Sequence, residues 1–158
     1  DKSTIWRRIC HVPRQVVAAP ALFDRIPRPE TPEELPPAQC LSYGHGGAAE
    51  SWTFTRGSLR RTVRAGTDVV SNNGEFLHAM AVSGNGMVNL PDFLVREALA
   101  SGALEAVLPD WQIAPLNLML YYPPYEKLPP LVETFTDFFE DYIRDVESFD
   151  FGPETPPR

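Results

Sequence analysis

The segment from Asp68 to Phe93 restricts the possible fold more than any other part of the chain. Its pattern is that of a strand, a polar turn, a helix, a glycine turn and a second strand. The polar turn, residues 71–74, consists of Ser, Asn, Asn and Gly, which are residue types that cap helices and form turns. Pro91 ends the second strand because proline cannot donate a backbone hydrogen bond. The segment therefore predicts an α/β fold with a helix between two parallel strands.

The polar turn Ser71–Gly74 is also the leading candidate for a ligand contact. A helix that follows a parallel strand begins at the carboxyl end of that strand, where its first N–H groups have no partner within the helix. Such groups favour an anionic or carbonyl ligand. Glu75 lies three residues after Asn72, which is the spacing of a capping box with Asn72 as the cap. The alternative interpretation is a helix cap that contacts no ligand.

Strand and helix patterns alternate through the chain from Val16 to Val146. A β-hairpin is predicted at 52–65, with a tight turn at Arg56-Gly57. The apolar run 116–122 is typical of a central parallel strand. The other predicted elements are strands at 14–19, 40–43 and 104–108, helices at 21–25, 91–101 and 129–146, and helical turns or coil at 2–10 and 32–35.

Three helices carry predicted apolar faces. The helix after Gly74 should turn Phe76, Leu77, Met80 and Ala81 inward and end at a left-handed Gly84, and the helix at 91–101 should turn Phe93, Leu94, Ala98 and Leu99 inward. In the helix at 129–146, Leu131, Phe135, Phe138, Tyr142 and Val146 repeat at helical spacing, and the stripe of Phe135, Phe138 and Tyr142 is predicted to be core or a contact between subunits.

Composition narrows the functional classes. A net charge of −7 argues against a stand-alone nucleic-acid-binding protein, because binding to phosphates requires an excess of Lys and Arg. No apolar run approaches the roughly 18 residues of a membrane span. Cys10 and Cys40 lack the spacing of a metal site; they could form one disulfide, but two reduced thiols are the simpler interpretation. No metal, cofactor or membrane partner is therefore expected.

Several segments resemble LysR-type transcriptional regulators. Gln15–Phe23 is similar to the family segment "vlvaSPaYl", and Leu90–Val95 is similar to "lPdflv". These motifs are individually weak, but their order and spacing over residues 10–146 match the family. The other similar segments, in chain order, are Pro32–Leu35 with Cys40–Tyr43, Trp52–Phe54, Ser71–Glu75, Gly84–Gly86, Ser101–Leu104, Leu108–Trp111 and Leu128–Phe138.

The resemblance implies an α/β effector-binding region built like a type 2 periplasmic binding protein, with a small-molecule effector in a cleft between two lobes. Residues 14–110 would be the complete second lobe. Residues 1–13 would be a remnant of the first lobe, 111–146 its return strand and helix, and 147–158 a disordered tail. The rest of the first lobe is expected to be absent. Operator DNA would be contacted only through a helix-turn-helix domain that is absent from this sequence.

The resemblance also implies the residues that contact the effector and the state of the protein. Ala19 and Phe23 stand where the family motif has serine and tyrosine, and Asn89 stands in a strand at a position that is usually apolar. A cytoplasmic homo-oligomer, a dimer or tetramer, is expected. The implied effector contacts are Ala18, Ala19, Pro20, Ser71, Asn72, Asn73, Gly74 and Met87.

Two other functions are weighed against a regulatory domain. A stand-alone solute-binding protein of the same fold would require a secretory signal upstream of Asp1. An enzyme would require a nucleophile, a base and an orienting acid. Ser42, His45 and Glu50 supply the residue types, but no G-x-S-x-G motif or phosphate loop accompanies them. The sequence therefore predicts a protein that is not an enzyme.

Overall fold

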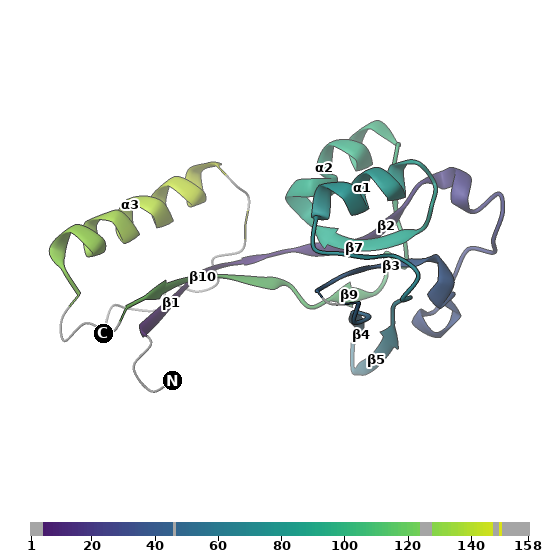
Figure 1. Cartoon of the computed structure of the whole chain (residues 1–158), viewed down its shortest axis with the longest axis horizontal. Helices are drawn as coiled ribbons and strands as arrows, with labels where there is room; N and C mark the ends of the chain where they lie inside the picture. The colour runs from purple at the N-terminus through teal and green to yellow at the C-terminus, as the bar shows by residue number, and fades with distance from the viewer. Residues whose placement is uncertain (1–4, 46, 124–127, 147–148, 150–158) are drawn as a thin grey trace. The chain divides into compact units, whose positions relative to one another are not determined.

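The computed structural model describes residues 5–45, 47–123, 128–146 and 149. The chain divides into two compact units (Figure 1). Unit 1 comprises Asp1–Pro13 and Pro115–Arg158, and unit 2 comprises Arg14–Ala114. Unit 2 extends beyond Asp110, the predicted end of the second lobe, because Ile113 pairs with Phe54 of the same unit. The predicted tail, 147–158, lies outside the described residues except for Phe149.

Unit 2 is built on a mixed five-stranded sheet with the strand order β6-β3-β7-β2-β8. Strands β6 and β7 are each parallel to β3, whereas β2 is antiparallel to its neighbours β7 and β8. The strands are β2 (Arg14–Ala18), β3 (Cys40–Tyr43), β6 (Val70–Ser71), β7 (Met87–Pro91) and β8 (Glu105–Ala106). The predicted parallel pair flanking a helix is confirmed, with β3 between its two members.

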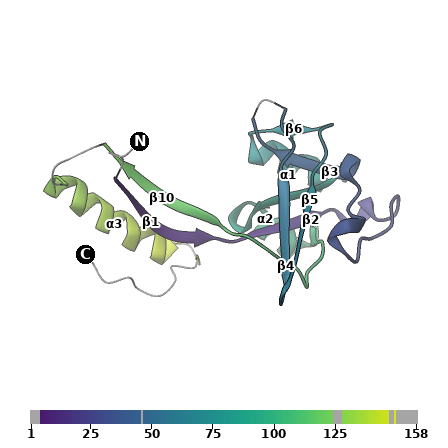
Figure 2. The same ribbon diagram turned by 90° about the horizontal axis from the view of Figure 1, so that it is seen from below.

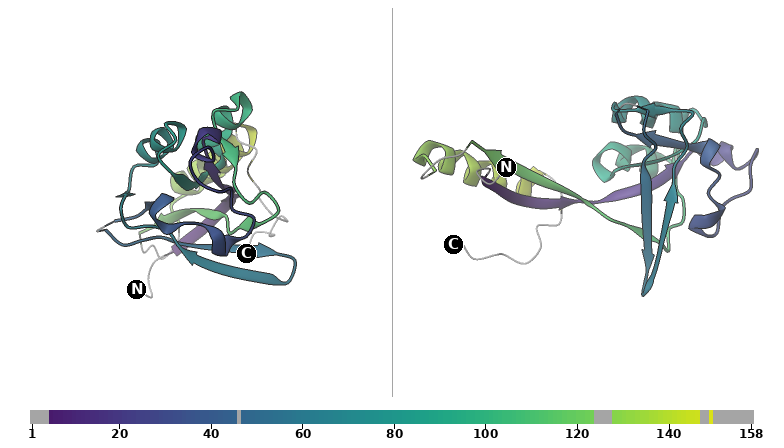
Figure 3. Two further views of the ribbon diagram at one scale, coloured as in Figure 1. Left: turned by 90° about the vertical axis from the view of Figure 1, so that its right-hand side faces the viewer. Right: turned by 60° about the horizontal axis from the view of Figure 1, so that its bottom comes forward.

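Helices α1 (Gly74–Val82) and α2 (Asp92–Ser101) cover one face of this sheet (Figure 1). The other face carries a three-stranded sheet in the order β5-β4-β9, formed by β4 (Ser51–Arg56), β5 (Leu59–Arg64) and β9 (Gln112–Ile113). Figure 3 shows β4 and β5 as the two long arms of the predicted hairpin. The sheet strands are apolar on both faces because each face is covered.

Alternating residues of the sheet strands therefore enter two different cores. Val17 and Val88 pack with Leu77 and Ala81 of α1, on the helical side. Val16 and Met87 pack with Trp52 and Phe54 of the hairpin, on the other side. Between β2 and β3 the chain forms only short 3₁₀ turns, at Pro20–Leu22, Pro32–Glu34 and Pro37–Gln39. The predicted helix at 21–25 is thus a single turn.

The predicted end of α1 is confirmed at Gly84, which has φ of +73°. The Gly84 and Asn85 N–H groups donate to the carbonyls of Ala81 and Met80, which is a Schellman motif. The predicted apolar faces need two corrections. Phe76 and Phe93 are each 47% exposed. Phe76 lies one residue before the buried Leu77, and Phe93 lies two residues before the buried Val95, so neither shares the buried face of its helix.

Unit 1 consists of a two-stranded antiparallel ribbon and one long helix. Strand β1 (Ile5–Val12) pairs with β10 (Leu116–Tyr122), and α3 (Pro130–Val146) runs beside this ribbon (Figures 1 and 2). Ile9, Cys10 and Val12 form its small core together with Leu118, Leu120 and Ile143. The predictions of a helical turn or coil at 2–10 and of a central parallel strand at 116–122 are therefore wrong. The apolar run 116–122 pairs with β1 and contributes Leu118 and Leu120 to this small core.

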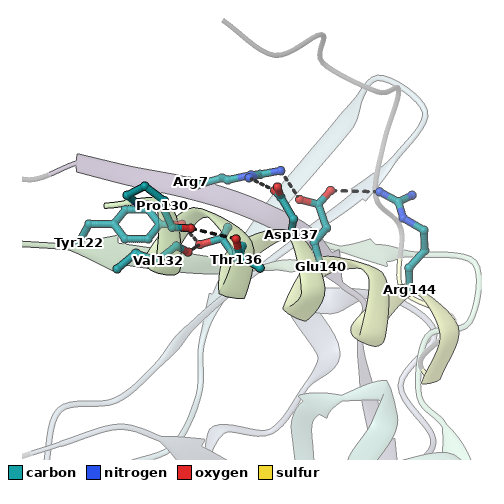
Figure 4. Close-up of polar contacts among 9 residues, drawn as sticks. Arg7, Tyr122, Pro130, Val132, Thr136, Asp137, Glu140 and Arg144 are labelled. Carbon is teal, nitrogen blue, oxygen red and sulfur yellow. Dashed lines mark hydrogen bonds and ion pairs between the residues drawn. The ribbon is translucent and has the colours of Figure 1, made fainter. Parts of the chain in front are cut away.

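Polar contacts fix α3 on the ribbon (Figure 4). Arg7 donates to Asp137 at 3.0 Å and to Glu140 at 2.6 Å, and Arg144 bonds Glu140 from the next turn of the helix at 3.1 Å. The hydroxyls of Tyr122 and Thr136 are 2.9 Å apart, and Thr136 is 1% exposed. These contacts orient α3 so that one face is buried and the other is not.

Candidate ligand-binding site

The carboxyl ends of the parallel strands β3 and β6 meet at one edge of the sheet in unit 2. Tyr43 is level with Ser71 in the register of the two strands. The Gly44 N–H donates to the Ser71 carbonyl at 3.1 Å. Asn72 Nδ2 and His45 Nδ1 are 3.4 Å apart. We call residues 43–45 and 71–74 the strand-end edge; it is the place at which a parallel sheet commonly presents its ligand contacts.

The start of α1 is capped by Asn73. Its Oδ1 accepts from the Phe76 N–H at 3.1 Å, and its own N–H donates to Ser71 Oγ at 3.1 Å. The prediction of Asn72 as the cap is wrong by one residue, because the helix begins at Gly74. Asn72 is thereby left exposed at the edge, where its side-chain amide meets His45.

Two backbone donors at the start of α1 have no acceptor among the described residues. Asn73 satisfies the N–H groups of Phe76 and Leu77, whereas those of Gly74 and Glu75 are unpaired. A Cβ on Gly74 would lie 2.9 Å from Leu94 Cδ1, so glycine lets the start of α1 pack closely on α2. The edge therefore offers N–H groups and amides that suit an anion or a carbonyl oxygen.

The other predicted effector contacts lie elsewhere. Met87 is level with Cys40, at the amino end of β3 and therefore at the opposite end of the sheet from Tyr43. Ala18, Ala19 and Met87 are 0%, 4% and 0% exposed, and their side chains belong to the two cores. Pro20 is exposed where it begins a 3₁₀ turn. The structure thus brings Ser71, Asn72, Asn73 and Gly74 together, but not Ala18, Ala19, Pro20 or Met87 with them.

A polar cluster that the sequence did not predict lies beneath the hairpin. It consists of Arg14, Ser42, Glu50, Trp52 and Asn89, and we call it the Glu50 cluster. The Glu50 carboxylate accepts from Trp52 Nε1 at 3.0 Å, Arg14 Nη1 at 3.2 Å, the Tyr43 N–H at 3.3 Å and Asn89 Nδ2 at 3.4 Å. Asn89, between Val88 and Leu90 in a buried strand, was the available signal, because a buried amide needs a polar partner.

The geometry of this cluster is not that of a catalytic triad. Ser42 Oγ donates to the Gly66 carbonyl at 2.6 Å and accepts from the backbone N–H of Glu50 at 3.3 Å. His45 contacts Asn72 instead. Ser42 therefore has no base that could activate it among the described residues. Its two bonds join the β3 strand to the segments that precede and follow the hairpin.

Three other features would bear on function in the described part of the chain: a metal site, a pocket and a membrane span. Among the residues that the structure describes, no group of three or more His, Cys, Asp or Glu side chains could hold a metal ion. A shallow depression of about 420 Å³ lies beside β5 and is lined by Pro37, Ala38 and Arg64–Asp68. No helix within the described ranges is both long and apolar enough to cross a membrane.

Cys40 is expected to be chemically inert in the folded protein. Cys10 and Cys40 are both buried and are not disulfide-bonded. Burial raises the pKa of the Cys40 thiol to about 12, and its Sγ contacts the Pro36 carbonyl at 3.3 Å. Cys40 stays protonated in the folded protein up to a higher pH than in the unfolded chain. Its effect on the free energy of unfolding is therefore constant at neutral pH, and the folded state loses stability as the pH rises from the ordinary thiol pKa towards 12.

Alkylation with iodoacetamide at pH 8, followed by peptide mass spectrometry, tests this expectation. Cys40 should react at less than about a tenth of the rate of an unfolded thiol, because little thiolate is present. The same residue should react fully after unfolding in guanidinium. Rapid modification in the folded protein would contradict a buried, protonated thiol.

Comparison with known proteins gives one consistent result. A family model described as "LysR substrate binding domain" matches residues 1–144. The HTH-type transcriptional regulator PtxR of Pseudomonas aeruginosa is 28% identical over 138 residues, which are 86% of this chain and 44% of PtxR. An uncharacterized HTH-type transcriptional regulator of Haemophilus influenzae is 30% identical over 129 residues, or 82% of this chain and 45% of that protein. The chain thus spans less than half the length of these curated relatives, in their C-terminal regions.

Solved structures agree with the sequence comparison. The regulatory domain of the C227S variant of AphB from Vibrio vulnificus has a TM-score of 0.74 and 25% identity, and the match covers 90% of this chain and 71% of that one. The regulatory domain of CrgA from Neisseria meningitidis has a TM-score of 0.69 and 25% identity, covering 90% and 70%. The mixed α/β fold described above is therefore that of these regulatory domains.

Proposed function

This chain belongs to the LysR substrate-binding domain family, whose model matches residues 1–144, and we propose its function within that family. This family is not enzymatic, so the chain is the regulatory part of a LysR-type transcriptional regulator. We propose that this part senses a small-molecule effector and passes the signal to operator DNA through a helix-turn-helix domain. The match over nearly the whole chain, supported by relatives named as HTH-type regulators, carries the proposal.

The effector is proposed to bind at the strand-end edge. The N–H groups of Gly74 and Glu75, which lack an acceptor in the described part of the chain, and the exposed amide of Asn72 provide donors there. Tyr43 is 44% exposed and can cover an apolar or planar part of the ligand. These groups fit an effector that carries a carboxylate or carbonyl oxygen. Ser71 and Asn73 shape the turn by bonding to each other and to Phe76.

The wider architecture is proposed by analogy with the family. Unit 2 would be one lobe of a type 2 periplasmic-binding-protein-like domain, and unit 1 would contain part of the other lobe. Effector binding would then shift the population of a closed state in a DNA-bound oligomer, which acts in the cytoplasm. The relatives named above are regulators, which favours this function over a stand-alone solute-binding protein.

The reading frame upstream of Asp1 provides a direct genetic test of the regulator assignment. It should encode a winged helix-turn-helix and a linker helix within about one domain length, because the curated relatives are more than twice as long as their matched parts. A secretory signal directly upstream instead would support a solute-binding protein and overturn the proposal.

The exposed stripe of α3 should mediate self-association. Leu131, Phe135, Phe138 and Tyr142 are 81%, 57%, 64% and 52% exposed on one face of the helix. Such a patch commonly marks a protein–protein contact, and we expect a second copy of the chain to cover it. Light scattering coupled to gel filtration should show a dimer or larger species at micromolar concentration.

Phe138→Glu should shift this species towards the monomer, because it places a charge in the centre of the stripe. Asp141→Lys changes charge outside the stripe and serves as the control, with the oligomer retained. A monodisperse monomer of the unmodified chain would contradict this expectation.

A further inference from the structure

Two passages of the chain leave unit 2, one at Pro13–Arg14 and the other at Ala114–Pro115. Arg14 connects them. It begins β2, and its guanidinium reaches the second passage, where Nε and Nη2 donate to the Ala114 carbonyl at 3.0 and 2.9 Å. The two passages are thus held together on unit 2 by one side chain. A proline lies next to each, which further restricts the backbone there.

The remaining Arg14 nitrogen is held by the centre of the Glu50 cluster. Nη1 donates to Glu50 Oε1 at 3.2 Å, and the two side chains are only 18% and 17% exposed. Glu50 is itself immobilised by Trp52 Nε1, which is part of a fully buried side chain. An ion pair with this degree of burial and bonding is positioned far more firmly than one on the surface.

The same carboxylate also contacts the strand-end edge. Glu50 Oε2 accepts from the backbone N–H of Tyr43, the last residue of β3. The Glu50 N–H donates to Ser42 Oγ, which in turn donates to the Gly66 carbonyl. One residue therefore joins the end of β3, the hairpin and the arginine that holds both passages.

We propose that Arg14 and Glu50 form a clamp that fixes the two chain passages to unit 2 and couples their position to the strand-end edge. Both are positioning residues. A ligand that displaces Tyr43 changes the support of Glu50, and through Arg14 it changes the restraint on Ala114. The coupling to a ligand rests on the proposed function, whereas the clamp itself rests only on these contacts.

Arginine is required because its fork makes three contacts in fixed directions. A lysine at position 14 keeps the positive charge, but its single ammonium group cannot reproduce the planar arrangement of donors that binds Ala114 and Glu50 at once. The Glu50→Gln change would keep the size of the side chain but lose its charge and one acceptor oxygen. These two changes weaken the clamp without creating a cavity.

Hydrogen exchange measured by NMR on the ¹⁵N-labelled chain tests the clamp directly. In Glu50→Gln the Arg14 Nε–H and the Tyr43 N–H should exchange at least about tenfold faster, while Leu77 in α1 stays unchanged. Arg14→Lys should also accelerate hydrogen exchange of the Tyr43 and Ile113 backbone N–H groups, but to a smaller extent. Arg61→Met is the matched control, because Arg61 pairs with Glu33 on the surface with side chains 45% and 53% exposed.

The coupling is tested by effector response in the full-length regulator. Arg14→Lys and Glu50→Gln should shift the effector concentration for half-maximal response by about tenfold, with operator affinity in the absence of effector unchanged. Unchanged exchange in Glu50→Gln overturns the clamp. Faster exchange with an unchanged response overturns the coupling. A complete lack of effector response in the unmodified regulator defeats the proposed function, and the exchange data then decide the clamp alone.

Discussion

Replacement of Glu50 by alanine is expected to lower the free energy of unfolding by about 3 kcal/mol. The change removes the acceptor of Arg14 Nη1, Trp52 Nε1 and the Tyr43 N–H in one step. Trp52 is completely buried, so its indole N–H cannot turn to water. A buried donor without an acceptor costs about 1–3 kcal/mol, and an isolated cation beside it costs more.

Urea denaturation followed by circular dichroism measures this loss. Glu33→Ala is the matched control, because Glu33 also forms an ion pair with an arginine but is 53% exposed. Its effect should be below about 1 kcal/mol, the range of surface pairs. Equal losses for the two variants would mean that the Glu50 cluster contributes no more than a surface ion pair.

Replacement of both Asn72 and Asn73 by alanine is expected to raise the effector concentration for half-maximal response by a factor on the order of 10–100. Asn72 presents its amide at the strand-end edge, and Asn73 orients the turn that exposes the Gly74 and Glu75 N–H groups. Operator affinity without effector should remain unchanged, because the regulatory domain is not expected to contact DNA.

The structure separates the two roles in this pair. Asn73 caps α1, so its loss also costs about 1 kcal/mol of stability, whereas Asn73→Ser retains a capping oxygen. Asn72→Ala leaves the cap intact and reports on the ligand alone. Asn85→Ala, at the other end of α1, is the control for an exposed asparagine. Unchanged induction in a reporter assay with Asn72→Ala would exclude its amide as a contact.

The elements of unit 2 were predictable because their signals are local. The hairpin follows from alternation around Arg56-Gly57, and α1 follows from its asparagine cap and from Gly84. The strand Met87–Pro91 follows from an apolar run between glycine and proline. The cap itself was misplaced by one residue, because Asn72 and Asn73 are the same residue type and the local pattern does not distinguish them.

Long-range features were not predictable in the same way. Residues 5–12 form a strand because β10 pairs with them across more than a hundred residues, which no local pattern records. The Glu50 cluster contains residues in or next to the four strands β2, β3, β4 and β7. Of these residues, only the buried Asn89 indicated a polar cluster from the sequence. Met87 and the Ala18–Pro20 segment were grouped with Ser71–Gly74 by family resemblance, but register places Met87 and Ala18 at the opposite end of the sheet from Tyr43 and Ser71.

We propose that this chain senses an effector at the strand-end edge. Hydrogen–deuterium exchange on the full-length regulator, with and without an effector found by thermal shift, tests it most directly. The effector is expected to protect peptides that contain residues 43–45 and 71–77, while the tip of the β4–β5 hairpin at residues 56–59 stays unchanged. An effector that stabilises the regulator and protects other segments, leaving these two unprotected, would contradict the claim.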